Sequence, residues 1–219
     1  WFDALIGKYS SGNIYTLYGP AATGKTTCCF LASIKCSESN FKTIFLDAEN
    51  GFNSERIGQL ADGDSKSVFE NILYLRINSF DEQEKKIDAI YALSKKSKVK
   101  LIVIDTITYY YRTLVTKNPD DVNTRMIEQL KKLSALSKTN DLVIILTSQV
   151  YSLFNQEKKI NPVSGEIIKN HSDVLIEMDK DNSNMRFISL VKPKSEQKFN
   201  NPMHYEIKDI GIFRAAEHM

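Results

Sequence analysis

The chain has 219 residues, of which 42% are hydrophobic, and its 29 basic and 27 acidic residues leave a formal net charge of +2. This composition supports one substantial core and gives no global nucleic-acid signature, so contact with nucleic acid has to come from a local patch. No stretch approaches the roughly 20 apolar residues of a membrane-spanning helix, and no signal peptide is visible, so we expect no membrane contact.

Three cysteines, Cys28, Cys29 and Cys36, lie close together in one helical stretch. An odd number of cysteines without a disulfide framework favours a reducing compartment, and we therefore expect a cytoplasmic protein. Their spacing is not that of a zinc site, and small buried apolar side chains explain them better.

Short apolar runs alternate with longer amphipathic runs through the first two thirds of the chain. In chain order, the pattern predicts a strand over 13–19, a helix over 25–39, a strand over 42–49, a helix with Ser54 as its N-cap, a strand over 71–78, a helix over 79–98, a strand over 99–107, a helix over 121–140 and a strand over 141–150.

The pattern changes after Ser152. Two alternating runs flank the polar stretch "DKDNSN", which predicts an antiparallel hairpin, and 203–213 predicts one last strand. Repeated β–α units indicate a parallel sheet with helices on both faces. The predicted fold class is therefore α/β, with a mostly parallel central sheet and a C-terminal antiparallel β extension, in a single domain over residues 1–219.

The segment from Gly19 to Thr26 reads G-x-x-x-x-G-K-T between the first strand and the first helix. Glycines let backbone N–H groups turn toward phosphate oxygens, and the positive end of the following helix favours anions. In such a P-loop, Lys25 would reach the β- and γ-phosphates and Thr26 would ligate Mg²⁺. The candidate phosphate-binding residues are Gly19, Pro20, Ala21, Ala22, Thr23, Gly24, Lys25, Thr26 and Thr27.

Three polar residues follow later strands. Asp105 ends the apolar run "LIVIDT", at the carboxyl edge where open α/β sheets bind ligands, and could hold the Mg²⁺ shell. Glu49, in "FLDAENGF", could polarise a water for attack on a γ-phosphate, although spacing alone fits a solvated loop acid equally well. Gln149, in "LTSQV", could sense the γ-phosphate.

These four features in this order resemble the RecA-type recombinase ATPases over nearly the whole chain. The nearest resemblance is to the RadB family, the short archaeal paralogues of RadA, because "WFDALIG" begins almost at the ATPase core and leaves no N-terminal DNA-binding helical domain. The resemblance implies a RecA-like core that binds ATP and Mg²⁺, with Lys25, Glu49 and Gln149 as catalytic residues and Thr26 and Asp105 at the metal.

The resemblance also assigns residues outside the four motifs. Arg56 and Gln59 match positions that contact the adenine base, where an arginine plane suits a purine. Lys192 and Lys194 match lysines that reach a neighbouring subunit's nucleotide, although a solvated strand end explains them equally well. The segment "FDAL" does not fit the F-x-x-A tether of full recombinases, which argues against self-polymerisation and leaves a homo-oligomer open.

In this family single-stranded DNA is held by two loops, which correspond to 108–123 and 152–170. Aromatic rings can stack on bases while cations follow the phosphates. The candidate DNA-binding residues are Tyr109, Tyr110, Tyr111, Arg112, Phe154, Lys158 and Lys159. The tyrosines would instead pack on the core or a partner if no DNA binds, and Asp120 and Asp121 weaken the attraction.

We therefore expect a weakly hydrolysing ATPase of DNA repair and homologous recombination, which binds DNA and assists a RadA-type recombinase or another repair protein. A KaiC-like signalling ATPase and a non-hydrolysing, nucleotide-gated adaptor are the alternatives. A small-molecule P-loop kinase fits less well, because such kinases close an arginine-rich lid and the arginines here are scattered.

Overall fold

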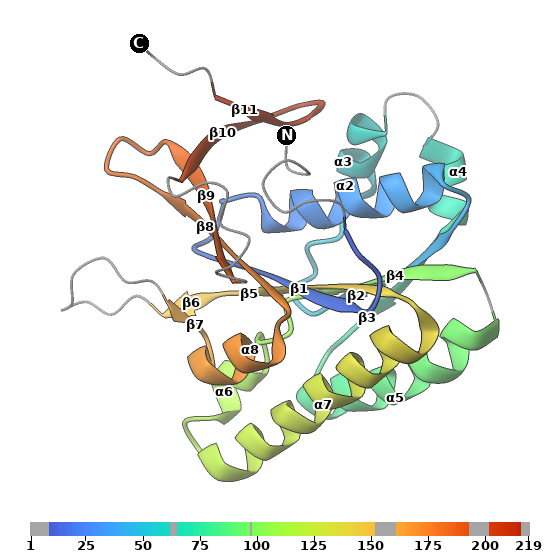
Figure 1. Ribbon diagram of the computed structural model, residues 1–219, viewed down its shortest axis with the longest axis vertical. Helices are drawn as coiled ribbons and strands as arrows, with labels where there is room; N and C mark the ends of the chain where they lie inside the picture. Colours follow the sequence, from blue (N-terminus) through green and yellow to red (C-terminus); the bar gives the residue numbers. More distant parts are fainter. Residues whose placement is uncertain (1–8, 62–64, 97, 152–160, 193–201, 216–219) are drawn as a thin grey trace.

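The computed structural model describes residues 9–61, 65–96, 98–151, 161–192 and 202–215. They form a nine-stranded sheet in the order β11-β10-β9-β8-β1-β5-β4-β2-β3 and a separate β6-β7 ribbon (Figure 1). The strands are β1 (Asn13–Tyr18), β2 (Lys42–Asp47), β3 (Ile72–Arg76), β4 (Val99–Asp105), β5 (Val143–Ser148), β6 (Val150–Tyr151), β7 (Asn161–Pro162), β8 (Val174–Lys180), β9 (Arg186–Lys192), β10 (Met203–Lys208) and β11 (Gly211–Arg214).

The strands from β8 to β3 are all parallel, as predicted for repeated β–α units. Side chains alternate between the two faces of a strand, so a continuous apolar run signals burial on both. In β4, Ile102 and Ile104 enter the core on one face, while Leu101 and Val103 enter the core on the other. This double burial explains the unbroken apolar sequence.

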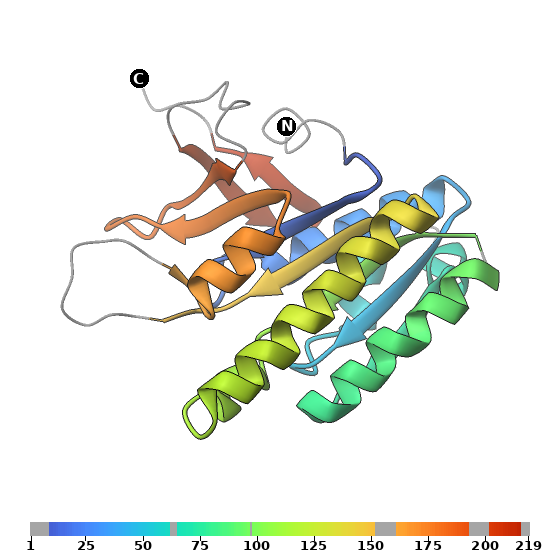
Figure 2. The same cartoon turned by 60° about the horizontal axis from the view of Figure 1, so that its bottom comes forward.

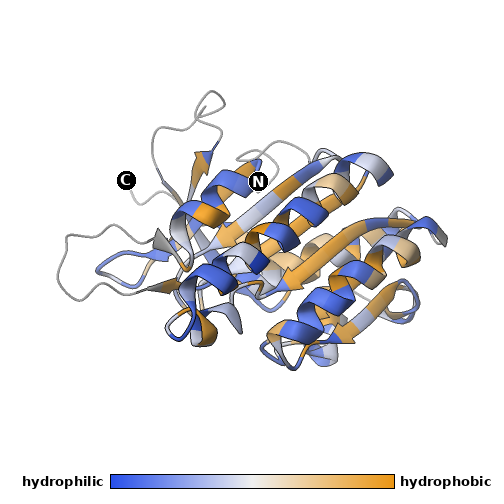
Figure 3. Cartoon of the chain, turned by 90° about the horizontal axis from the view of Figure 1, so that it is seen from below, coloured by the Kyte–Doolittle hydropathy of each residue, from blue (hydrophilic) through white to orange (hydrophobic). Residues whose placement is uncertain are grey.

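Helices cover both faces of the sheet (Figure 1). The helices are α2 (Lys25–Glu38), α3 (Ser54–Leu60), α4 (Ser65–Glu70), α5 (Phe80–Lys96), α6 (Tyr111–Leu114), α7 (Pro119–Asn140) and α8 (Gly165–His171). Helices α2, α3 and α4 lie on one face, and α5 to α8 lie on the other, where α5 and α7 run side by side (Figure 2). Hydrophilic and hydrophobic residues alternate along the helices on the α5 and α7 side of the sheet, which faces the viewer in Figure 3.

The C-terminal extension is antiparallel, as predicted, and β8 and β9 form the expected hairpin. The single strand expected over 203–213 is wrong. This segment forms two strands, β10 and β11, which pair antiparallel with Lys208 opposite Gly211. Gly211 has φ 149°, a backbone conformation that glycine adopts readily. The chain therefore reverses within "DIG", too short a turn for an alternating pattern to reveal.

Smaller differences also have physical reasons. The N-cap of α3 is Asn53, whose side chain accepts a hydrogen bond from the Arg56 N–H, and not Ser54. Helix α7 begins at Pro119, which suits a first helical turn. Helices α4, α6 and α8 and the β6-β7 ribbon were not predicted, since each is too short to show a period. None of the helices in the described ranges combines the length and apolar character that crossing a membrane requires.

Gly19, which directly follows β1, provides a test of how closely the backbone packs against β8 at this point. Its φ is 153°, and a Cβ atom there would lie 1.8 Å from the Met178 carbonyl oxygen of β8. We expect Gly19→Ala to destabilise the protein by about 3 kcal/mol in urea unfolding, because backbone must move and strain is added. Gly58→Ala in α3, where a Cβ would meet only Ser65 at 3.9 Å, is the matched control. Equal stability of both variants would contradict this reading.

Candidate functional site

A pocket of about 720 Å³ lies at the carboxyl edge of β1, β2, β4 and β5, over the loop that joins β1 to α2. This is the edge at which the polar residues were expected to converge. Its lining residues are Gly19, Pro20, Ala21, Ala22, Gly24, Lys25, Thr26, Thr27, Glu49, Asp105, Thr106, Arg112, Gln149, Val150, Arg186 and Ile207. The four sequence features therefore meet at one pocket.

Lys25 is the first residue of α2 and is held against the loop that precedes it. Its Nζ donates to the carbonyl oxygens of Gly19 at 2.8 Å and Pro20 at 2.7 Å. Burial lowers the pKa of the ammonium, while the nearby carboxylates of Asp105 and Glu49 act in the opposite direction. A bound phosphate would offer this buried charge a stronger partner than carbonyl dipoles do.

The loop itself is braced by side chains that face the protein. The Thr23 hydroxyl, which is fully buried, donates to the Pro20 carbonyl at 3.0 Å. The Tyr205 hydroxyl donates to the Thr23 carbonyl at 2.5 Å, and Arg186 Nε donates to the Ala22 carbonyl at 3.1 Å. The side chain of Thr23 therefore supports the loop and does not line the pocket.

Thr26 and Asp105 meet as the motif requires. The Thr26 hydroxyl donates to Asp105 Oδ2 at 2.7 Å, and the Thr147 hydroxyl donates to Asp105 Oδ1. Burial raises the pKa of Asp105 above its ordinary value, although both hydroxyl bonds act to lower it. The hydrogen bonds to this buried carboxylate come from neutral hydroxyl groups, so a bound cation would stabilise its charge further. Its oxygens, with that of Thr26, are the ligand type that Mg²⁺ prefers, so these residues fit the cation.

Glu49 lies just beyond β2 and is held by two donors. Thr106 Oγ1 donates to Glu49 Oε1 at 2.5 Å, and Gln149 Nε2 donates to the same oxygen at 2.7 Å. The Gln149 amide oxygen in turn accepts a hydrogen bond from Arg112. The structure thus brings together the acid and the glutamine predicted for the hydrolytic site.

Asp47 positions this acid, and the sequence reasoning gave it no role. Asp47 is 1% exposed, and its carboxylate accepts hydrogen bonds from the N–H groups of Glu49 at 3.1 Å, Gly51 at 3.1 Å and Phe52 at 2.9 Å. An aspartate that binds the backbone two residues ahead forms an Asx turn. The motif D-x-E-x-G carried this signal, since the aspartate shapes the loop that presents Glu49.

Arg56 and Gln59 are adjacent on α3, but neither is among the described residues that line the pocket. Arg56 donates to Gln59 Oε1 at 3.1 Å and, at 2.7 Å each, to the carbonyl oxygens of Lys208 and Asp209 in the β10–β11 turn. In this structure Arg56 therefore connects α3 to the C-terminal extension. Their contact with adenine stays a prediction.

Lys192 lies at the end of β9 and is engaged within its own chain. Its Nζ donates to the carbonyl oxygens of Ser172 at 2.6 Å and Lys169 at 3.2 Å, at the end of α8. A lysine is stabilised there by the negative end of the helix. Lys194 lies outside the described residues, so the shared nucleotide site stays a prediction.

The tyrosines after β4 differ from one another. Tyr109 and Tyr110 are half-buried and stack edge to face at 5.0 Å, and Arg112 lies over the Tyr109 ring at 5.4 Å. Tyr111 is 4% exposed and donates to Asn123 at 2.6 Å. The Tyr111 ring is therefore part of the core in this structure, which argues against its stacking on bases, although that contact stays a prediction. Phe154, Lys158 and Lys159 lie outside the described residues.

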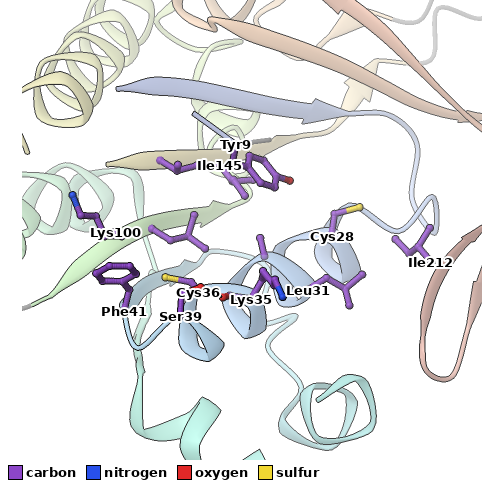
Figure 4. Close-up of a pocket in the computed structure, with 13 residues that line it drawn as sticks. Tyr9, Cys28, Leu31, Lys35, Cys36, Ser39, Phe41, Lys100, Ile145 and Ile212 are labelled. Carbon is purple, nitrogen blue, oxygen red and sulfur yellow. Dashed lines mark hydrogen bonds between the residues drawn. The ribbon is translucent and has the colours of Figure 1, made fainter. Parts of the chain in front are cut away.

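A second pocket, of about 400 Å³, lies between α2 and the face of the sheet (Figure 4). Its lining is mainly apolar, with Leu31 of α2 and Ile145 of β5 among its residues. The two lysines at its border, Lys35 and Lys100, form ion pairs with Glu38 at 2.8 Å and Asp141 at 2.9 Å. This pocket presents apolar surface, whereas the 720 Å³ pocket presents the groups suited to phosphate.

Comparison with known proteins agrees with this geometry. A family model described as Rad51 matches residues 2–215. The chain is similar to the DNA repair and recombination protein RadB of Methanosphaera stadtmanae, with 32% identity over 96% of this chain and 91% of that protein. It is 33% identical to RadB of Methanocaldococcus jannaschii over 81% of this chain and 83% of that protein.

A solved structure described as the RadB recombinase is similar in fold. It matches with a TM-score of 0.80 and 23% sequence identity, over 98% of this chain and 96% of that one. The mostly parallel sheet with its antiparallel C-terminal strands is therefore that of a Rad51- and RecA-like α/β protein.

The buried charge of Asp105 gives a test that separates stability from binding. A raised pKa means that the folded state favours the neutral carboxyl, so ionised Asp105 reduces stability at neutral pH. We expect Asp105→Asn to stabilise the metal-free protein by about 1 kcal/mol, or roughly 2–4 °C in Tm for a chain of this size. Thermal melts should also show that Mg²⁺ with ATP raises Tm less in the variant than in the wild type. A lower Tm for the metal-free variant would contradict this interpretation.

Proposed function

The chain belongs to the Rad51 family, and from that premise we propose that it is an ATP-binding DNA repair and homologous recombination protein. In this proposal it is a RadB-like recombinase paralogue that hydrolyses ATP weakly, binds single-stranded DNA and assists a RadA-type recombinase. The observation that carries the proposal is the meeting of Lys25, Thr26, Asp105, Glu49 and Gln149 at one pocket. We further propose that residues 1–219 are one RecA-like ATPase core.

Each residue has a role that its contacts support. Lys25 would bind the β- and γ-phosphates, and the N–H groups of the loop would surround them at the positive end of α2. Thr26 and Asp105 would hold Mg²⁺, which when bound supplies positive charge to the phosphate oxygens. Glu49 would accept a proton from the attacking water, in an orientation set by Asp47 and Thr106.

Weak hydrolysis is consistent with the state of Glu49. Its Oε1 already accepts hydrogen bonds from Thr106 and Gln149, so this oxygen is engaged before a water arrives. The same observation supports a second candidate function, a nucleotide-gated adaptor that binds ATP without turning it over. Membership of the Rad51 family over residues 2–215 argues against the KaiC-like and kinase alternatives.

Binding to DNA and to a RadA-type protein rests on the similarity to RadB proteins and on local chemistry. Tyr109 and Arg112 lie together beyond β4, where a base and a phosphate could be bound by neighbouring groups. The net charge of +2 means that these contacts need support from the predicted second loop, with Phe154, Lys158 and Lys159. We also propose that a homo-oligomer, if it forms, brings Lys192 and Lys194 toward a neighbour's nucleotide.

Two substitutions separate binding from chemistry. Lys25→Ala should weaken binding of ATP with Mg²⁺ at least tenfold, or about 1.4 kcal/mol, because the phosphates lose their cation. Glu49→Gln should bind ATP as the wild type does and lower turnover by about 100-fold, since the proton acceptor is removed. Calorimetry and phosphate release, with and without single-stranded DNA and a RadA-type protein, measure both.

Glu55→Gln is the matched control, because Glu55 is an exposed acid in the first turn of α3 and does not line the pocket. Turnover at the wild-type rate by Glu49→Gln would mean that Glu49 is not the base. Tight ATP binding with no turnover by the wild type under any of these conditions would favour the adaptor.

The two proposed loops should contribute to DNA binding in different ways. Each lost contact between a cation and a phosphate reduces the slope of log affinity against log salt by about 0.7 for single strands. The double variant Lys158→Ala/Lys159→Ala should therefore flatten this slope. Tyr109→Ala should cost roughly 1–3 kcal/mol at every salt concentration, because stacking is uncharged. Fluorescence anisotropy with a labelled oligonucleotide and ATP measures both effects.

Lys131→Ala/Lys138→Ala, on the exposed face of α7, is the control for the loss of two charges. If it flattens the salt slope as much as the loop variant does, binding is a general charge effect. If the wild type binds no DNA even at low salt, the DNA-binding role belongs to a partner.

A further inference from the structure

Arg112, Gln149 and Glu49 form a chain of side chains at the edge of the 720 Å³ pocket. The guanidinium of Arg112 donates to Gln149 Oε1, and Gln149 Nε2 donates to Glu49 Oε1 at 2.7 Å. The three residues come from three different segments, namely the start of α6 and the ends of β5 and β2. Arg112 is therefore connected to the hydrolytic acid, although sequence analysis placed it only in a DNA-binding loop.

The chemistry of the two ends fixes the orientation of the amide between them. A guanidinium only donates hydrogen bonds, and an ionised carboxylate only accepts them. Turning the Gln149 amide over would set its NH₂ group against the Arg112 donors and its oxygen against Glu49. Arg112 and Glu49 together therefore determine which way the Gln149 amide faces.

Arg112 also differs from the other cations of the pocket. Lys25 donates to the carbonyl oxygens of Gly19 and Pro20, and Arg186 donates to the carbonyl oxygen of Ala22. Both cations are therefore bound to the loop between β1 and α2. The described contacts of the Arg112 guanidinium are with two neutral groups outside that loop, the Gln149 amide and the Tyr109 ring. Arg112 is also an exposed residue. A neutral amide is a weaker partner for a guanidinium than a phosphate.

We propose that Arg112 is a specificity-determining residue that distinguishes the triphosphate from the diphosphate by binding the γ-phosphate. In the proposed function Glu49 activates the water that attacks the γ-phosphate, so the γ-phosphate would lie at the side of the pocket where Glu49 and Gln149 meet. When Arg112 moves from the Gln149 amide to this phosphate, the amide loses one of the two contacts that hold it, so Gln149 can leave Glu49 more readily. The inference deepens the proposed function and rests on it, because it assumes that ATP occupies this pocket.

The test compares equilibrium binding of ATPγS and ADP, each with Mg²⁺, by calorimetry. Arg112→Ala should weaken ATPγS binding about tenfold and change ADP binding by less than twofold. Arg112→Lys, which keeps the charge but not the planar fork, should retain part of the preference for ATPγS. Lys117→Ala removes a cation from the same segment outside the pocket lining and should behave as the wild type does.

The ratio of the two affinities separates a direct role from a structural one. A merely structural defect would weaken both nucleotides together, and that result, or no change in either affinity, would overturn the proposal; far-UV circular dichroism verifies that each variant is folded. Failure of the wild type to bind either nucleotide would refute the proposed function together with this inference. If the wild type binds both and Lys25→Ala loses both, while Arg112→Ala keeps the wild-type ratio, the proposed function stands and only the role of Arg112 is wrong.

Discussion

The buried carboxylate of Asp105 is the constraint on which the site depends. It ends β4 beside Asp47, its register partner at the end of β2, and both aspartates are buried. A charge removed from water has to be compensated by hydrogen bonds or by ions. Asp47 is compensated by backbone N–H groups, whereas the hydrogen-bond donors to Asp105 are the hydroxyl groups of Thr26, Thr147 and Thr106. A cation bound next to Asp105 would therefore stabilise its carboxylate, because the hydroxyl groups that contact it carry no charge.

The same carboxylate organises the surrounding elements. Thr26 connects the first turn of α2 to β4, and Thr147 connects β5 to β4, so the start of α2 and two strands are joined through one carboxylate. Thr106, the next residue along, carries the connection to Glu49. The groups proposed to hold the metal and to activate the water thus share one continuous set of hydrogen bonds, and a change at one of them should affect the others.

Much of this arrangement could be predicted because it is written in local patterns. The apolar run before Asp105 and the glycine spacing of the loop both reflect backbone geometry within a few residues. They predicted that Lys25, Thr26 and Asp105 lie at one edge of the sheet, and these residues do line one pocket. Contacts between distant segments left no such trace. Nothing near Arg56 indicates that it binds carbonyls of the β10–β11 turn more than 150 residues away. Tyr111 reads as one of three equivalent tyrosines until the short helix α6 turns its ring into the core.

The C-terminal strands determine which fragments of this protein can form the loop between β1 and α2. Gly19 lies against the Met178 carbonyl of β8, a Cβ at Gly24 would meet Ile207 of β10 at 2.6 Å, and Tyr205 and Arg186 bond the loop carbonyls. The loop between β1 and α2, near the start of the chain, is therefore packed against residues of the C-terminal strands. A fragment that stops after β5 keeps the whole G-x-x-x-x-G-K-T motif but lacks these contacts from the C-terminal strands. Mixing this fragment with a second fragment that carries β8 to β11 should consequently restore the folded loop, which the first fragment cannot form by itself.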